Sequence, residues 1–71
     1  MTTTRRVKND DRTWRTEIRV DWYEPRHFAA DGEYPAQWCV VEVETGEVID
    51  SGLTKREAEK AAEEMNWIEQ V

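Results

Sequence analysis

Residues 38–67 read WCVVEVETGEVIDSGLTKREAEKAAEEMNW, and this stretch decides the fold. Its first half is rich in valine, which suits a pleated strand, and Gly46 lies where a hairpin has to turn. A glycine readily adopts the positive φ that a type I turn followed by a G1 bulge requires. The pattern therefore predicts a β-hairpin with strands at 37–44 and 47–51, joined by a turn at 44–47.

The second half of the stretch predicts an amphipathic helix. Gly52 ends the preceding strand, and Thr54 with Glu57 three residues later has the spacing of a capping box. Small apolar residues recur at helical spacing and form one narrow stripe: Ala58, Ala61, Ala62 and Met65. Asn66 is expected to end the helix. The alanines predict a close approach of helix to sheet, so a larger residue at position 61 or 62 would overpack the core.

The N-terminal part divides into a predicted tail and a predicted strand. Residues 1–13 are polar and follow neither the helical nor the strand period, which predicts a flexible tail. Residues 14–23 alternate, which predicts a half-buried strand. The expected core face carries Trp14, Thr16, Ile18, Val20 and Trp22, and the expected solvent face carries Arg15, Glu17, Arg19, Asp21 and Tyr23. Pro25 is expected to close this strand, and residues 25–35 to form a loop.

Together these elements predict the α+β class, with a three-stranded antiparallel meander packed against one C-terminal helix (βββα). The predicted domain spans residues 14–71. The faces of the second strand stay open, because Trp38 and Val40 point to one side whereas Cys39, Val41 and Val43 point to the other. Whichever set faces away from the helix forms an apolar patch that suits a protein partner or a second copy.

The charge is distributed unevenly along the 71 residues, whose formal net charge is -6. The balance is +2 up to Arg26 and -8 from His27 onward. A surface of the second kind repels nucleic acid and attracts basic protein surfaces. The composition therefore favours a protein partner over direct binding of nucleic acid.

The sequence offers no recognisable catalytic or metal-binding motif. His27 and Cys39 are the only histidine and cysteine, at unrelated positions, so no zinc ligand set is predicted. A single cysteine favours a reducing, intracellular setting. No window approaches the roughly 20 apolar residues of a membrane span, and the N-terminus lacks the apolar core of a signal peptide. We expect a cytoplasmic protein that is not an enzyme and has no cofactor, metal or membrane segment.

Residues 38–66 resemble the hairpin-plus-helix of many short proteins of bacteria and their phages. Small acidic proteins of this kind look like phage-encoded inhibitors, anti-CRISPR proteins among them. The resemblance implies a non-enzymatic inhibitor that acts in the cytoplasm of the host bacterial cell. It carries over no site residue.

The expected function is docking on a basic, nucleic-acid-binding surface of a host defence complex, because an array of carboxylates can imitate a phosphate backbone. The expected contact comprises two aromatic anchors and six carboxylates: Tyr23, Trp38, Glu42, Glu44, Glu47, Asp50, Glu59 and Glu63. One alternative is a single-stranded nucleic-acid binder that uses Arg15 and Arg19 of the first strand. Another is a structural homodimer, paired through a strand edge or the open sheet face.

Overall fold

The structure, a computed structural model, describes residues 2–70. Within this range the element order is β1 (Thr4–Lys8), β2 (Trp14–Arg19), β3 (Tyr23–Phe28), β4 (Gln37–Glu42), β5 (Val48–Leu53), α1 (Lys55–Met65) and β6 (Trp67–Glu69). The strands form two antiparallel three-stranded sheets, sheet A in the order β1-β2-β6 and sheet B in the order β3-β4-β5. The α+β class is confirmed. The arrangement differs from a single meander, because the two ends of the chain build a second sheet.

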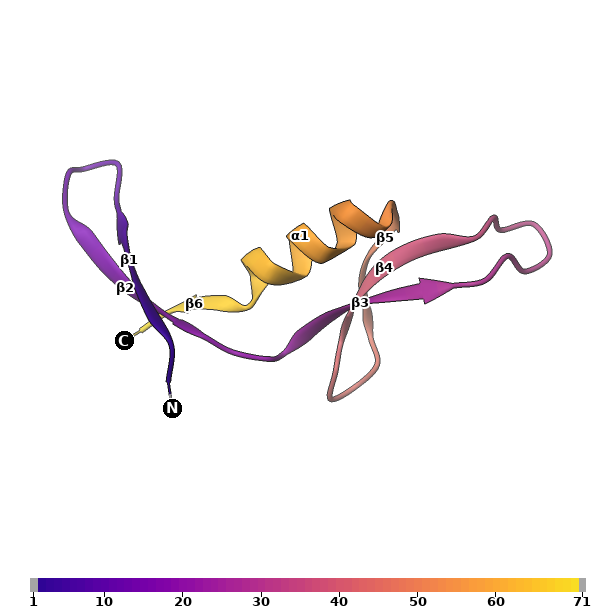
Figure 1. The fold of residues 1–71 in the computed structure, drawn as a ribbon, viewed down its shortest axis with the longest axis horizontal. Coiled ribbons are helices and arrows are strands. Elements are labelled where there is room, and N and C mark those ends of the chain that lie inside the picture. The colour runs from indigo at the N-terminus through magenta and orange to yellow at the C-terminus, as the bar shows by residue number, and fades with distance from the viewer. Residues whose placement is uncertain (1, 71) are drawn as a thin grey trace.

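The molecule is elongated, with sheet A at one end, sheet B at the other and α1 running between them (Figure 1). Its principal extents are 49 × 26 × 15 Å, and the Cα radius of gyration is 15.0 Å. A compact chain of this length has a radius of gyration of about 11 Å. The protein therefore exposes far more surface than a sphere of the same mass.

The apolar core lies between α1 and sheet B. Val40, Ala58 and Ala62 are almost fully buried there, and five partly buried residues pack around them: Tyr23, Trp38, Leu53, Ala61 and Met65. The predicted stripe of the helix is thus the face that meets the sheet. Val40 and Trp38 face the helix, which places Cys39 and Val41 on the far face of sheet B, where both are also buried.

The local signals around the hairpin and the helix are confirmed. The Thr54 side chain accepts from the Glu57 backbone N–H, and the Glu57 carboxylate accepts from the Thr54 backbone N–H, so the capping box is complete. Asn66 is the C-cap. Gly46 has a φ of 75° in the turn, where its N–H donates to the Glu42 carbonyl over 2.7 Å.

Several strand boundaries in sheet B differ from the prediction, and the strand expected at 37–44 ends at Glu42. Pro25 lies inside β3 instead of closing a strand, and the predicted loop at 25–35 loses its first residues to β3. A proline is tolerated there because β3 is an edge strand of sheet B, with one side that forms no hydrogen bonds to a neighbouring strand. On that side the missing backbone N–H of a proline costs no hydrogen bond of the sheet. Gly52 does not end β5, which continues to Leu53 with Gly52 at a φ of 71°.

The single strand predicted for residues 14–23 is divided between the two sheets. It breaks after Arg19, and the chain resumes in sheet B at Tyr23. Its faces also differ from the prediction, because Glu17 is buried at 8% exposed whereas Trp14 and Trp22 are 54% and 51% exposed. The alternating pattern does belong to a strand. Its charged face can nevertheless be buried, because a charged side chain that is paired with an opposite charge tolerates burial.

The predicted tail at 1–13 contains a strand, because β1 pairs in antiparallel register with β2 from Thr4 opposite Ile18 to Lys8 opposite Trp14. The connecting turn is closed by Asp11, whose carboxylate accepts from the N–H and the hydroxyl of Thr13 over 3.1 and 2.6 Å. A turn of this kind needs no apolar residue, so the polar composition of residues 1–13 gave no indication of the hairpin. Met1 of the predicted tail and Val71 of the predicted domain lie outside the described residues.

Asn66 joins the two halves of the molecule. Its side-chain oxygen accepts from the backbone N–H groups of Trp22 and Tyr23 over 3.1 and 2.9 Å, and its amide nitrogen donates to the Tyr23 carbonyl over 2.9 Å. Its own carbonyl accepts from the Val20 N–H over 2.7 Å. The end of α1 is thereby fixed to the segment that connects sheet A to sheet B.

Candidate functional site

A surface hollow of about 450 Å³ lies where this connecting segment meets the β4–β5 hairpin. The lining residues are Asp21, Trp22, Tyr23, Glu42, Val43 and Glu44. We call it the acidic hollow, because three of the six are carboxylates and none is basic. Trp22 and Val43 are 51% and 49% exposed, so the hollow also offers apolar surface to a ligand.

Backbone hydrogen bonds hold the two apolar residues of the acidic hollow together. The Val43 N–H donates to the Trp22 carbonyl over 2.9 Å. This bond extends the register in which Tyr23 lies opposite Glu42, so Trp22 and Val43 share the face of sheet B that points away from α1. Asn66 also fixes this segment, because its side-chain oxygen accepts hydrogen bonds from the backbone N–H groups of Trp22 and Tyr23. The hollow is therefore held by elements from both halves of the chain.

Two of the three carboxylates of the acidic hollow form no ion pair with another described residue. The ion pairs among the described residues all use an arginine at position 5, 15, 19 or 26. Asp21 lies 3.9 Å from the Arg19 guanidinium and is otherwise almost fully exposed. Glu42 and Glu44 form no ion pair within residues 2–70. Such a cluster suits a cation whose apolar stem lies along Trp22 and Val43.

The structure places the predicted aromatic anchors partly inside the protein. Tyr23 and Trp38 are partly buried and pack against the core beneath α1. The Trp38 ring also lies 5.2 Å from the His27 ring and within 5.9 Å of the Lys55 ammonium. Tyr23 contributes one wall of the acidic hollow, but the exposed aromatic residue there is Trp22, which the sequence reasoning assigned to the core. The alternation placed Trp22 inside because it did not reveal the break between sheets.

The six predicted carboxylates fall into two groups. Glu42 and Glu44 line the acidic hollow, while Glu47 and Asp50 lie further along the same hairpin. Glu59 is on the exposed face of α1, where Lys55 and Arg56 lie one turn earlier.

Glu63 is engaged within the protein. It pairs with Arg19 over 3.1 Å and accepts from the Trp67 indole N–H over 3.4 Å. The helix is therefore less free than the hairpin to bind a basic partner.

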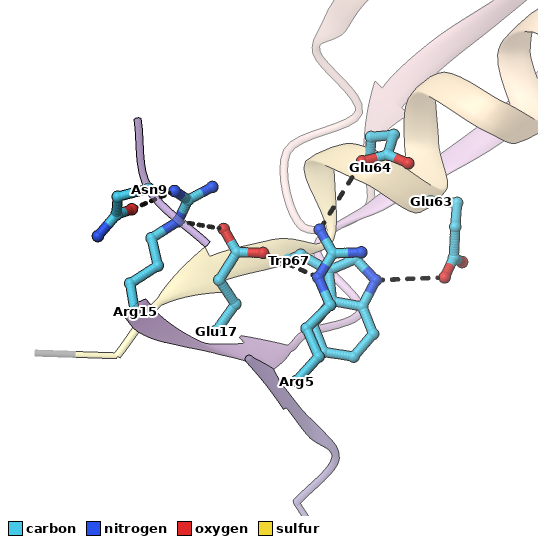
Figure 2. A network of polar contacts seen from close by, with 7 residues as sticks. All are labelled: Arg5, Asn9, Arg15, Glu17, Glu63, Glu64 and Trp67. Atoms are coloured by element: carbon cyan, nitrogen blue, oxygen red, sulfur yellow. Dashed lines mark hydrogen bonds and ion pairs between the residues drawn. The ribbon is translucent and has the colours of Figure 1, made fainter. Parts of the chain in front are cut away.

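Sheet A carries the arginines that the nucleic-acid alternative needs, but most are already paired (Figure 2). The Glu17 carboxylate accepts from Arg5 Nε over 2.8 Å and from Arg15 Nε over 3.2 Å. The Arg5 guanidinium also stacks 4.4 Å from the Trp67 ring centroid and lies 3.8 Å from Glu64. Arg15 donates a further bond to Asn9 over 2.6 Å.

The opposite face of sheet A carries unpaired cations. The register places Arg6 and Lys8 on the face of Trp14, and the Arg6 guanidinium lies 5.0 Å from the Trp14 ring centroid. Neither cation forms an ion pair in the described part of the chain. Trp14 is as exposed as Trp22, so the two ends of the molecule present similar aromatic surfaces with opposite charges beside them.

Three carboxyl groups have pKa values below their ordinary range because neighbours stabilise the charged form. A hydrogen bond from Arg5 lowers the pKa of Glu17, and Arg15 adds to the effect. The Thr13 hydroxyl lowers the pKa of Asp11, and the Thr54 backbone N–H lowers that of Glu57. All three are structural groups outside the acidic hollow.

The described residues contain no cluster of three or more His, Cys, Asp and Glu side chains arranged to hold a metal ion. Among them, no helix has the length and apolar character needed to cross a membrane. Comparisons with protein-family models, with curated proteins and with solved structures gave no match for this chain.

Proposed function

We propose that this protein is a non-enzymatic binding module that docks on a basic, nucleic-acid-binding surface of a partner protein. The observation that carries the proposal is the acidic hollow, whose lining combines three carboxylates with an exposed tryptophan and valine. An arginine or lysine of the partner would lay its stem on Trp22 and place its charged head among the carboxylates. Surfaces that bind phosphate backbones are rich in such side chains.

The unpaired hairpin carboxylates extend this contact. Glu47 and Asp50 form no ion pair in residues 2–70, so the hairpin projects negative charge beyond the hollow. Complementary charge of this kind raises association rates and selects basic partners. The resemblance to phage-encoded inhibitors favours a nucleic-acid-handling defence complex in the bacterial cytoplasm as the target.

Capture of partners from a bacterial lysate, with and without nuclease, tests the proposal. The tagged protein should retain a nucleic-acid-handling complex after nuclease treatment, and the purified protein should then compete with nucleic acid for that complex. Trp22→Ala and Glu44→Lys should each weaken capture at least about tenfold, since both remove part of the same contact. Asp10→Lys is the matched control, because it makes the same charge change in the exposed β1–β2 turn, outside the expected contact.

Two results would contradict the proposal. One is capture that survives Trp22→Ala and Glu44→Lys unchanged. The other is capture of unrelated proteins that disappears with nuclease, which would indicate binding through nucleic acid.

A second candidate function is supported by the other end of the molecule. Arg6, Lys8 and the exposed Trp14 offer phosphate contacts and a stacking surface on one face of sheet A. Single-stranded nucleic acid would then bind through these residues and not through Arg15 and Arg19, which are engaged in ion pairs. Fluorescence anisotropy with a labelled oligonucleotide should show salt-dependent binding that Arg6→Ala removes and Arg15→Ala preserves.

A further inference from the structure

The protein exposes more surface than a monomer of its mass should. Its accessible surface is 5712 Å² for a mass of 8.4 kDa. A compact monomer of this mass exposes about 4,600 Å², which leaves an excess of about 1,100 Å². A stable protein interface takes about 800 Å² from each partner. The excess reflects the elongated shape of the whole molecule and exceeds what one side of an interface requires.

The far face of sheet B, opposite α1, provides an apolar surface of the right kind. The register places Phe28 opposite Gln37 and Val48 opposite Val41, so these residues share the face of Cys39. A second hollow of about 310 Å³ lies here, with Cys39 at 2% exposed and Phe28, Tyr34 and Val48 exposed around it. We call Phe28, Tyr34, Cys39 and Val48 the apolar patch.

The apolar patch is also the least charged part of this face. Asp31 is the one charged residue that lines its hollow in the described chain. Arg26 and Glu24, which lie on the same face beside Cys39 and Val41, form an ion pair with each other. Two copies that each carry a net charge of -6 repel, so they can associate only where few carboxylates face each other.

We infer that a second copy of this chain covers the apolar patch and forms a twofold-symmetric dimer. In such a contact the same residues meet from both sides, so Phe28, Tyr34 and Val48 of each copy bury one another. The acidic hollow, with Trp22 and Val43, borders the patch on the same sheet face and is presented twice per dimer. The inference is independent of the proposed function, because it concerns only purified protein.

Sedimentation equilibrium of the purified chain at about 1 to 200 μM tests the inference. The wild type should approach twice the mass of 8.4 kDa at the upper concentrations. Val48→Glu should raise the dimer dissociation constant about a hundredfold or more, because each copy would bring a carboxylate into an apolar contact. Ile49→Glu is the matched control, since Ile49 is 40% exposed in the same strand and does not line the patch.

Tyr34→Ser provides a second variant in case Val48→Glu disturbs folding. The Tyr34 side chain is 71% exposed, so its removal should weaken the dimer while the circular dichroism spectrum stays unchanged. A wild type that stays monomeric at 200 μM would overturn the inference and leave the patch to a foreign apolar partner. Dimers that persist in both Val48→Glu and Tyr34→Ser, or that are lost in Ile49→Glu, would overturn the assignment of the face.

Discussion

Sheets A and B have three strands each, but different forces hold them. Sheet B packs on α1 through an apolar core around Val40, Ala58 and Ala62. Sheet A has no residue in that core, and its most buried side chain is the carboxylate of Glu17, held between two arginines. The contrast shows that a chain with few aliphatic residues can build one half by apolar burial and the other by ion pairs and backbone pairing.

The largest effect should come from breaking the joint between the two sheets. Asn66→Ala removes three side-chain hydrogen bonds to the backbone of Trp22 and Tyr23. Leaving such groups unpaired should cost about 3 kcal/mol of unfolding free energy. Urea denaturation followed by tryptophan fluorescence measures the loss. Asn66→Asp keeps the acceptor but places a carboxylate oxygen against the Tyr23 carbonyl in a site that is 4% exposed, so it should not rescue the loss.

The next effect concerns the apolar half. Ala62→Leu should destabilise the protein by about 1–3 kcal/mol, because Ala62 is 3% exposed and the helix has no room for extra methylene groups. Ala61 is only partly buried beside the core, so Ala61→Leu should cost clearly less. Thermal unfolding of both variants checks the difference. Equal losses would mean that the helix can shift away from sheet B.

A smaller effect should follow removal of the helix cap. Thr54→Ala deletes the hydroxyl that accepts from the Glu57 N–H, which should lower the free energy of unfolding by about 1 kcal/mol. Hydrogen exchange should accelerate in the first turn of α1 and remain unchanged in β1 and β2. Faster exchange throughout sheet A would indicate that the two halves unfold as one unit.

The smallest global effect is expected from the ionic half. Glu17→Gln removes the charge between Arg5 and Arg15 while keeping the shape of the side chain. The pKa of Glu17 is lower in the folded protein than its ordinary value of 4.5, so its stabilising effect is complete above that value and is lost as the pH falls below it. The difference in melting temperature between wild type and variant should therefore shrink on acidification from pH of about 6 to about 3, and also with added salt. A difference that is constant with pH would contradict the ionic account.

The sequence predicted the elements whose signals are local. The capping box at Thr54 and Glu57, the alanine stripe and the turn at Gly46 each depend on residues a few positions apart, and all are confirmed. The α+β class followed from them. These features need no knowledge of the rest of the chain.

The features that the sequence did not reveal depend on distant partners. Glu17 is covered because Arg5 reaches it from another strand, 12 residues away. Trp22 is exposed because Asn66, 44 residues further along, fixes the backbone at the break between the sheets. A period-two pattern shows neither a register nor a change of sheet. The candidate site was therefore predicted in part, with Glu42 and Glu44 found and Trp22 missed.

The most direct test of the account compares the two exposed tryptophans, Trp22 beside carboxylates and Trp14 beside cations. A short arginine-rich peptide is added to ¹⁵N-labelled protein, and the indole N–H signals are followed by nuclear magnetic resonance. The account predicts that the Trp22 signal shifts together with the Glu42 and Glu44 amides, that salt weakens the shift, and that Trp14 stays in place. A peptide that shifts Trp14 as much as Trp22, or leaves the acidic hollow unchanged, would contradict it.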